Sequence, residues 1–302
     1  MNTIFSTFTF ILILIFTGIT LSGACLAGEK INQSLSVETT GIVYVNIPRG
    51  LVNIQGWDKP KVMIQGELDD TTKRLIFKTE NNKTFIKVDT EGQQHWGDSS
   101  VLSIFIPQQL QLRFKGIDTS FILSKLNSDI EGKSINGDLM VKKSHGKIKL
   151  SVVSGNVTLI ESSGFAKIKS VSGMVNFSGD FEQAYLKSIS GDIKADVSGT
   201  DKLTIKNISG DTQISGQAKN KAQLELSSVS GDILYKVTDE LNAECEVVSQ
   251  FGGEINNQLT DDLPIEGNLN KKTLSFISGD GSGRLSMNTV NGSVSIEKII
   301  NE

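Results

Sequence analysis

Several residue types are scarce in this chain of 302 residues, and each scarcity excludes a class of protein. Two cysteines, Cys25 and Cys245, are too few for a disulfide framework. The two histidines, His95 and His145, lack the neighbouring cysteines and carboxylates of a zinc site. Four prolines against 29 glycines indicate turns that need positive φ rather than a stiff linker. A net charge of −4 gives no basic domain, so we expect no nucleic-acid partner.

Arginine is scarce as well, and its four positions are scattered: Arg49, Arg74, Arg113 and Arg284. An enzyme that cleaves glycans on a β-helix needs clustered carboxylates, or a base beside an arginine, on one wall. Ser144 and Lys147 match the Ser-x-x-Lys pattern, but the chain has no Lys-Thr-Gly partner motif. The sequence therefore predicts no catalytic residue, no cofactor and no metal ligand.

Charge is missing altogether from residues 1–27, where an apolar run over 4–21 is followed by small residues. This pattern is typical of a secretory signal peptide. We expect either cleavage after Ala27 or lipidation of Cys25, whose preceding residues resemble a lipobox with its leucine displaced. An uncleaved membrane anchor is the third alternative, because no lysine or arginine precedes the apolar run. Each alternative predicts export to the periplasm or cell surface.

What the chain has in abundance is regularly spaced glycine. Between residues 136 and 232 the glycines recur first at nine and then at eighteen to twenty-one residues. The units align on the turn glycines Gly155, Gly173, Gly191, Gly210, Gly231 and Gly292. Apolar residues recur five and two positions before each glycine, and two and four positions after it, with few exceptions. Because alternate side chains of a strand share a face, we expect all four positions to face a common interior.

A unit of this length cannot bury its own apolar face, but stacked copies build a continuous core. The repeat therefore predicts an all-β fold, a parallel β-solenoid (β-helix) with two short strands in each rung of 18–21 residues. A β-sandwich is the alternative, although it would not require the same residue types at fixed offsets from every turn. The short interval between Gly279 and Gly292 suggests a rung that has lost one strand.

The alternating residues 43–47, 52–54, 62–64, 84–88 and 101–106 predict further strands before the repeats. We therefore divide the chain into a signal peptide (1–27), an N-terminal β region (28–125) continuous with the solenoid, and the repeats (126–302). A polar stretch near 256–272 contains Pro264 and is expected to form a loop insertion.

Several motifs resemble the putative-adhesin β-strand-repeat family, a bacterial domain family of unknown function. They lie at Ile47–Ile54, Gly56–Asp58, Ile189–Ile193, Val229–Ile233 and Gly283–Val294, within a resemblance that covers about Gly41 to Lys298. The resemblance implies an exported β-helical protein of the cell envelope. It implies no catalytic residues.

Two columns of charge follow from the alignment. Acidic residues follow the turns at Asp138, Asp192, Asp211, Asp232 and Asp280, and we interpret them as turn formers, because Asn156 and Met174 interrupt the column. Lysines recur four positions before the glycine, with a second column two residues earlier: Lys169, Lys187 and Lys206, then Lys149, Lys167 and Tyr185. Stacked like charges destabilise a sheet, so this face is either a solvated surface or a site for an anionic polymer.

The sequence thus predicts an exported, non-enzymatic binding or structural protein of the envelope or cell surface. The expected partner is an anionic surface polysaccharide or another envelope protein, with the membrane reached only through a lipid anchor. A polysaccharide-active enzyme on a β-helix and a membrane-attached accessory protein of envelope stress signalling are the alternatives.

Overall fold

The computed structural model of the chain describes residues 30–90 and 99–299. The predicted signal segment, Cys25 and His95 lie outside these described residues. Within the two described ranges, no helix is long and apolar enough to cross a membrane.

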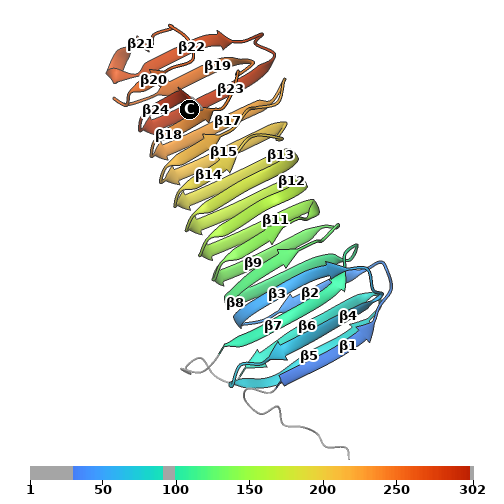
Figure 1. Cartoon of the computed structure of the whole chain (residues 1–302). Coiled ribbons are helices and arrows are strands. Elements are labelled where there is room, and N and C mark those ends of the chain that lie inside the picture. The colour runs from blue at the N-terminus through green and yellow to red at the C-terminus, as the bar shows by residue number, and fades with distance from the viewer. Residues whose placement is uncertain (1–29, 91–98, 300–302) are drawn as a thin grey trace, which may run out of the picture.

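Strands make up most of the described chain, which confirms the prediction of an all-β fold (Figure 1). The strands of the first half are β1 (Lys30–Ser36), β2 (Ile42–Asn46), β3 (Arg49–Trp57), β4 (Lys61–Glu67), β5 (Thr72–Glu80), β6 (Lys83–Thr90), β7 (Ser100–Pro107), β8 (Gln111–Ser124), β9 (Ile130–Asn136), β10 (Leu139–Lys142), β11 (His145–Ser154) and β12 (Val157–Ser172). Those of the second half are β13 (Val175–Ser190), β14 (Ile193–Asp196), β15 (Lys202–Ser209), β16 (Thr212–Ser215), β17 (Gln223–Ser230), β18 (Ile233–Val237), β19 (Ala243–Ser249), β20 (Ile255–Asn257), β21 (Ile265–Glu266), β22 (Lys272–Ser278), β23 (Gly283–Asn291) and β24 (Val294–Lys298). One 3-10 turn, η1 (Asn268–Asn270), interrupts them.

Successive repeats lie side by side and pair in parallel, each displaced by one unit along the chain. Leu150 of β11 pairs with Ile168 of β12, and Leu139 of β10 pairs with Val157 of β12. The paired strands form two faces of the stack. The first face contains β9, β11, the second half of β12, the second half of β13, β15 and β17. The second face contains β10, the first halves of β12 and β13, β14, β16 and β18.

The core lies between the two faces, where alternate side chains of both sets of strands meet. Phe114 and Phe121, from the two ends of β8, have ring centroids 4.5 Å apart, and Phe177 and Phe181 of β13 are 4.9 Å apart. Leu186 and Ile205 are fully buried in successive rungs. Each rung thereby adds one layer to a single apolar interior.

The order of rungs in space departs from the order in the chain at both ends. The strands β2 and β3 lie between β6 and β7 on one side and β8 on the other. Likewise β23 lies between β17 and β19, and β24 lies between β18 and β20. The last strands of the chain are therefore inserted into the stack between two rungs that both precede them in sequence.

Antiparallel strands close both ends of the stack. At the N-terminal end β5 pairs with β6, and β1 and β4 extend the other face beyond β7. At the C-terminal end β22 pairs with β19 and with β21. The two ends lie at opposite extremes of the elongated stack (Figure 1).

The prediction of a rung with a lost strand between Gly279 and Gly292 is wrong. Gly279 lies in the turn between β22 and β23, with φ of 60°, and is no corner of the stack. The rung that turns at Gly292 has both strands, β23 and β24, so the short interval reflects a hairpin turn that precedes it.

Candidate functional site

The six residues of the predicted lysine columns lie together on the outer side of the first face. Lys169, Lys187 and Lys206 are direct partners in successive strands. Lys149, Lys167 and Tyr185 form the neighbouring column in the same way. The Lys167 ammonium lies 5.6 Å from the centre of the Tyr185 ring, where a cation–π contact is favourable.

The first of these columns is longer than the aligned repeats predict. Ser151 pairs with Lys169 on one side and with Lys133 on the other, and Lys133 pairs with Lys115. The column therefore runs Lys115, Lys133, Ser151, Lys169, Lys187 and Lys206. The sequence contains the signal for this longer column, because positions 115, 133, 151, 169 and 187 are each eighteen residues apart. The alignment on the turn glycines does not include it, because β8 and β9 precede the aligned units.

These five lysines form what we call the lysine column: Lys115, Lys133, Lys169, Lys187 and Lys206. Among the described residues, none of the five is within ion-pair distance of a carboxylate. Adjacent strands are about 4.8 Å apart, and two unit charges at such a distance repel by about 1 kcal/mol in water. The column thus concentrates positive charge that the surrounding side chains leave uncompensated.

The prediction that apolar residues two positions before the turn face the interior is wrong. Val153, Val171, Ile189, Ile208 and Val229 are 40–46% exposed, whereas the preceding residues, such as Val152 and Ser188, are buried. The physical reason is parity. A residue five positions before the glycine and one two positions before it are separated by an odd number, so they point to opposite sides of a strand. Beyond the glycine, the residues two and four positions after it are buried again.

An exposed aliphatic column therefore runs parallel to the lysine column. We define the aliphatic column as Ile117, Ile135, Val153, Val171, Ile189 and Ile208, all between 40% and 51% exposed. A groove of about 410 Å³ separates the two columns between Gly116 and Ile189. Its floor consists of small residues, among them Gly116, Ser134 and Ser170, and its lining contains no carboxylate and no histidine.

The acidic residues after the turns have a structural task, as predicted for turn formers. The side-chain oxygen of Asp192 accepts a hydrogen bond from the Asp211 amide at 2.9 Å, and Asp211 accepts one from the Asp232 amide at 3.0 Å. Asn156 continues this ladder by accepting from the Met174 amide at 2.9 Å. Asp280 does not belong to the column, because it lies in the turn between β22 and β23.

Asp280 accepts hydrogen bonds from Ser282, which lower the pKa of its carboxyl group. No group of three or more histidine, cysteine, aspartate or glutamate side chains could hold a metal ion in the part of the chain that the structure describes.

The other polar residues considered from the sequence are occupied by local contacts. The Ser144 hydroxyl is buried and donates to the Lys142 carbonyl at 3.0 Å. His145 Nδ1 lies 2.9 Å from the Ser163 hydroxyl. Cys245 is buried in β19, and burial raises the pKa of its thiol to about 12. None of these residues faces the groove.

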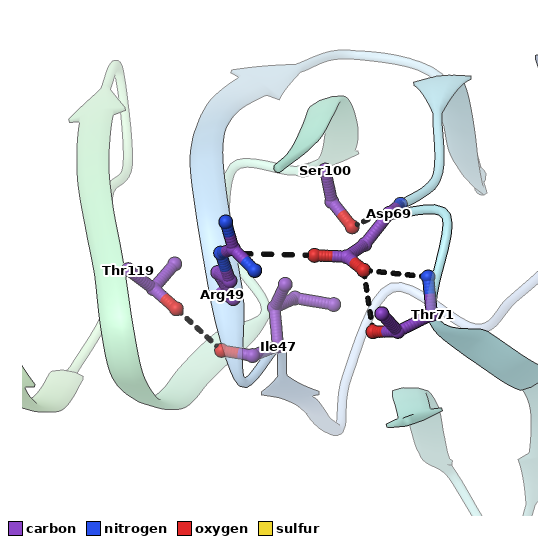
Figure 2. A network of polar contacts seen from close by, with 6 residues as sticks. All are labelled: Ile47, Arg49, Asp69, Thr71, Ser100 and Thr119. Carbon is purple, nitrogen blue, oxygen red and sulfur yellow. Dashed lines mark hydrogen bonds and ion pairs between the residues drawn. The ribbon is translucent and has the colours of Figure 1, made fainter. Parts of the chain in front are cut away.

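A second polar cluster lies at the N-terminal end and holds the first rungs together (Figure 2). The buried Asp69 carboxylate accepts hydrogen bonds from the Thr71 amide at 2.8 Å and the Thr71 hydroxyl at 2.5 Å. Its other oxygen lies 3.9 Å from Arg49 Nε, and its amide donates to the Ser100 hydroxyl at 2.8 Å. The cluster joins β3, β7 and the β4–β5 loop, so it stabilises the packing of the first rungs.

Comparison with known proteins finds a matching family model and solved structures of similar fold. The family model described as Toastrack DUF4097 matches residues 51–297. A putative adhesin from Parabacteroides merdae is 12% identical with a TM-score of 0.53, over 91% of this chain and 98% of the other. A second putative adhesin, from Parabacteroides distasonis, is 13% identical with a TM-score of 0.49, over 90% and 98%.

A third solved structure, called a putative lipid binding protein, also comes from Parabacteroides distasonis. It is 12% identical with a TM-score of 0.40, over 91% of this chain and 99% of the other. At these identities the likeness concerns the fold alone, and the structure from Parabacteroides merdae is similar enough to support it. No curated protein matches the chain.

Proposed function

The chain belongs to the Toastrack DUF4097 family, and from that premise we propose that it is an exported binding module of the bacterial envelope. In this proposal the stacked rungs act as a rigid β-solenoid, and the lysine column holds an anionic polymer such as a surface polysaccharide. The observation that carries the proposal is the column of five lysines, interrupted by Ser151, without a carboxylate partner among the described residues. An anionic polymer would supply the missing counter-charges.

Retention of the purified protein on immobilised polygalacturonate tests this proposal, with uncharged dextran as the matrix control. We expect retention at low salt that is lost at high salt, because exposed charge pairs are screened. The triple variant Lys169→Ser, Lys187→Ser and Lys206→Ser should elute at clearly lower salt than the unsubstituted protein.

A matched control removes three lysines from the second face: Lys142→Ser, Lys194→Ser and Lys236→Ser. These positions lie on β10, β14 and β18, so the net charge changes equally while the lysine column is preserved. Equal loss of retention in both triple variants would show a nonspecific charge effect and would sink the proposal.

The groove lining supports a binding role over hydrolysis or elimination, since it offers lysines, serines and aliphatic residues but no carboxylate pair. We therefore propose that the protein binds the polymer in this groove without cleaving it. Incubation with polygalacturonate should release no new reducing or unsaturated ends, and their protein-dependent appearance would favour the alternative of a polysaccharide-active enzyme.

Export and attachment are proposals that rest on the uncharged segment 1–27. Mass spectrometry of protein isolated from cells would give an N-terminus at Gly28 after simple cleavage. An acylated Cys25, lost in Cys25→Ser together with membrane retention, would instead indicate a lipid anchor. That result would favour the membrane-attached accessory role. An N-terminus at Met1 in a cytosolic fraction would contradict export.

A further inference from the structure

The aliphatic column is the least expected surface of this protein. Isolated apolar residues are common on protein surfaces, but six aliphatic side chains in consecutive rungs form a continuous stripe. The stripe contains valine and isoleucine and no aromatic residue, so it offers no platform for stacking sugar rings. Over six rungs spaced by about 4.8 Å it extends for roughly 25 Å.

The groove beside this stripe has two chemically different sides. Val153, Val171 and Ile189 line one side, and Lys133, Lys169 and Lys187 line the other. The backbone amides and carbonyls of the floor are engaged in the parallel pairing of strands, for example between Val152 and Ser170. A ligand that lies in this groove therefore meets apolar surface along its length and positive charge along one edge.

We propose that the groove holds the alkyl chain of an anionic amphiphile, whose charged part lies on the lysine column. The inference rests on the proposed function and specifies the ligand further, because an anionic polymer without an alkyl chain would leave the aliphatic side uncovered. The volume of about 410 Å³ lies within the usual range for small-molecule sites. The lysines select for negative charge, and the aliphatic side chains select for chain length.

A second copy of the protein is the main competing occupant of the stripe. Two copies that met with their lysine columns opposed would repel each other, and no carboxylate lines the groove to compensate. The uncompensated charge therefore favours an anionic ligand over self-association through this groove.

Binding of octanoate, decanoate and dodecanoate to the purified protein, each as a monomer in solution, tests the inference by equilibrium dialysis. Each buried methylene should tighten binding by up to about fourfold, and by about twofold where the open groove covers the chain only in part. Dodecyl maltoside, which has the same chain and no charge, should bind at least tenfold more weakly than dodecanoate.

The variant Val153→Ser, Val171→Ser and Ile189→Ser should weaken dodecanoate binding at least tenfold and leave retention on polygalacturonate unchanged. The control Val101→Ser, at a 53% exposed position of β7, should change neither. All these positions are exposed, and unfolding curves check that each variant is folded. If the triple variant does not fold, Val171→Ser alone replaces it, with a smaller loss expected.

Affinity for the carboxylates that is independent of chain length, or unchanged in the serine variants, would overturn this inference. Retention on polygalacturonate in that case would leave the proposed function intact. Equal binding of dodecyl maltoside would overturn the role of the lysines. A dimer in light scattering that separates in the triple serine variant would show that a second copy occupies the stripe, and would also overturn it. Chain-length-dependent binding of the carboxylates without retention on polygalacturonate would instead refute only the proposal of a polymer ligand.

Discussion

At the scale of single residues, the corner glycines are the positions where substitution is least tolerable. Gly173 has φ of 114°, and a Cβ there would lie 2.1 Å from the carbonyl oxygen of Gly155 in the preceding rung. The same approach recurs at Gly191 and Gly210, so a side chain would push neighbouring rungs apart. We expect Gly173→Ala to lower the free energy of unfolding by about 3 kcal/mol, measured by urea denaturation.

Two other glycines separate the contributions to this cost. Gly252 has φ of 75°, but no atom lies within 4 Å of the position that a Cβ would occupy, so Gly252→Ala should cost only about 1 kcal/mol. Gly267 has neither a positive φ nor a close neighbour, and Gly267→Ala should change stability little. Similar losses in all three variants would contradict the explanation by rung contact.

The buried thiol of Cys245 gives a second prediction at this scale. Burial raises the pKa of the thiol from 9.0 to about 12, so the folded state favours the protonated form. At pH 8 an aromatic disulfide reagent should therefore react with Cys245 only after urea unfolds the protein. The stabilising contribution of this group is complete below pH 9 and is lost as the pH rises towards 12. Rapid reaction in the native protein would show that β19 opens locally.

At the scale of elements, the lysine column places like charges on adjacent strands. Lys187 lies between Lys169 and Lys206, so Lys187→Gln should raise the free energy of unfolding by about 0.5 kcal/mol at low salt. The gain should disappear at high salt, where the repulsion is screened. The matched control is Lys194→Gln on β14, whose cross-strand partners Asn176 and Gln213 are neutral. No stabilisation in Lys187→Gln relative to this control would show that the column carries no electrostatic strain.

The strands and the lysine face could be predicted because both depend on a repeat that the sequence displays directly. The register that joins Lys169 to Lys187 follows from their spacing of eighteen residues. The exposed side of Val171 also follows from the sequence, because Val171 lies an odd number of residues after buried Ile168 on the same strand. The apolar character of Val171 predicted burial instead, so apolar character two positions before the turn does not imply burial.

At the scale of the whole molecule, sequence order proved an unreliable guide to the order of rungs. Consecutive repeats usually stack on each other, and this expectation holds from β9 to β18. It fails at the C-terminal end, where β23 and β24 separate β17 and β18 from β19 and β20. The repeat period contains no information on such insertion, because every rung presents compatible hydrogen-bonding edges to every other.

Removal of the last rung tests how strongly this insertion holds the C-terminal end together. Deletion of residues 283–302 removes buried Leu285, Met287, Val294 and Ile296, together with the pairing of β23 to both β17 and β19. We expect β19–β22 to lose its docking site, so that amide hydrogen exchange over 243–278 becomes fast while residues 139–215 stay protected. Deletion of residues 300–302 alone is the control and should leave exchange unchanged. Retained protection over 243–278 in the longer deletion would mean that β19 can pair directly with β17, as the sequence order alone would suggest.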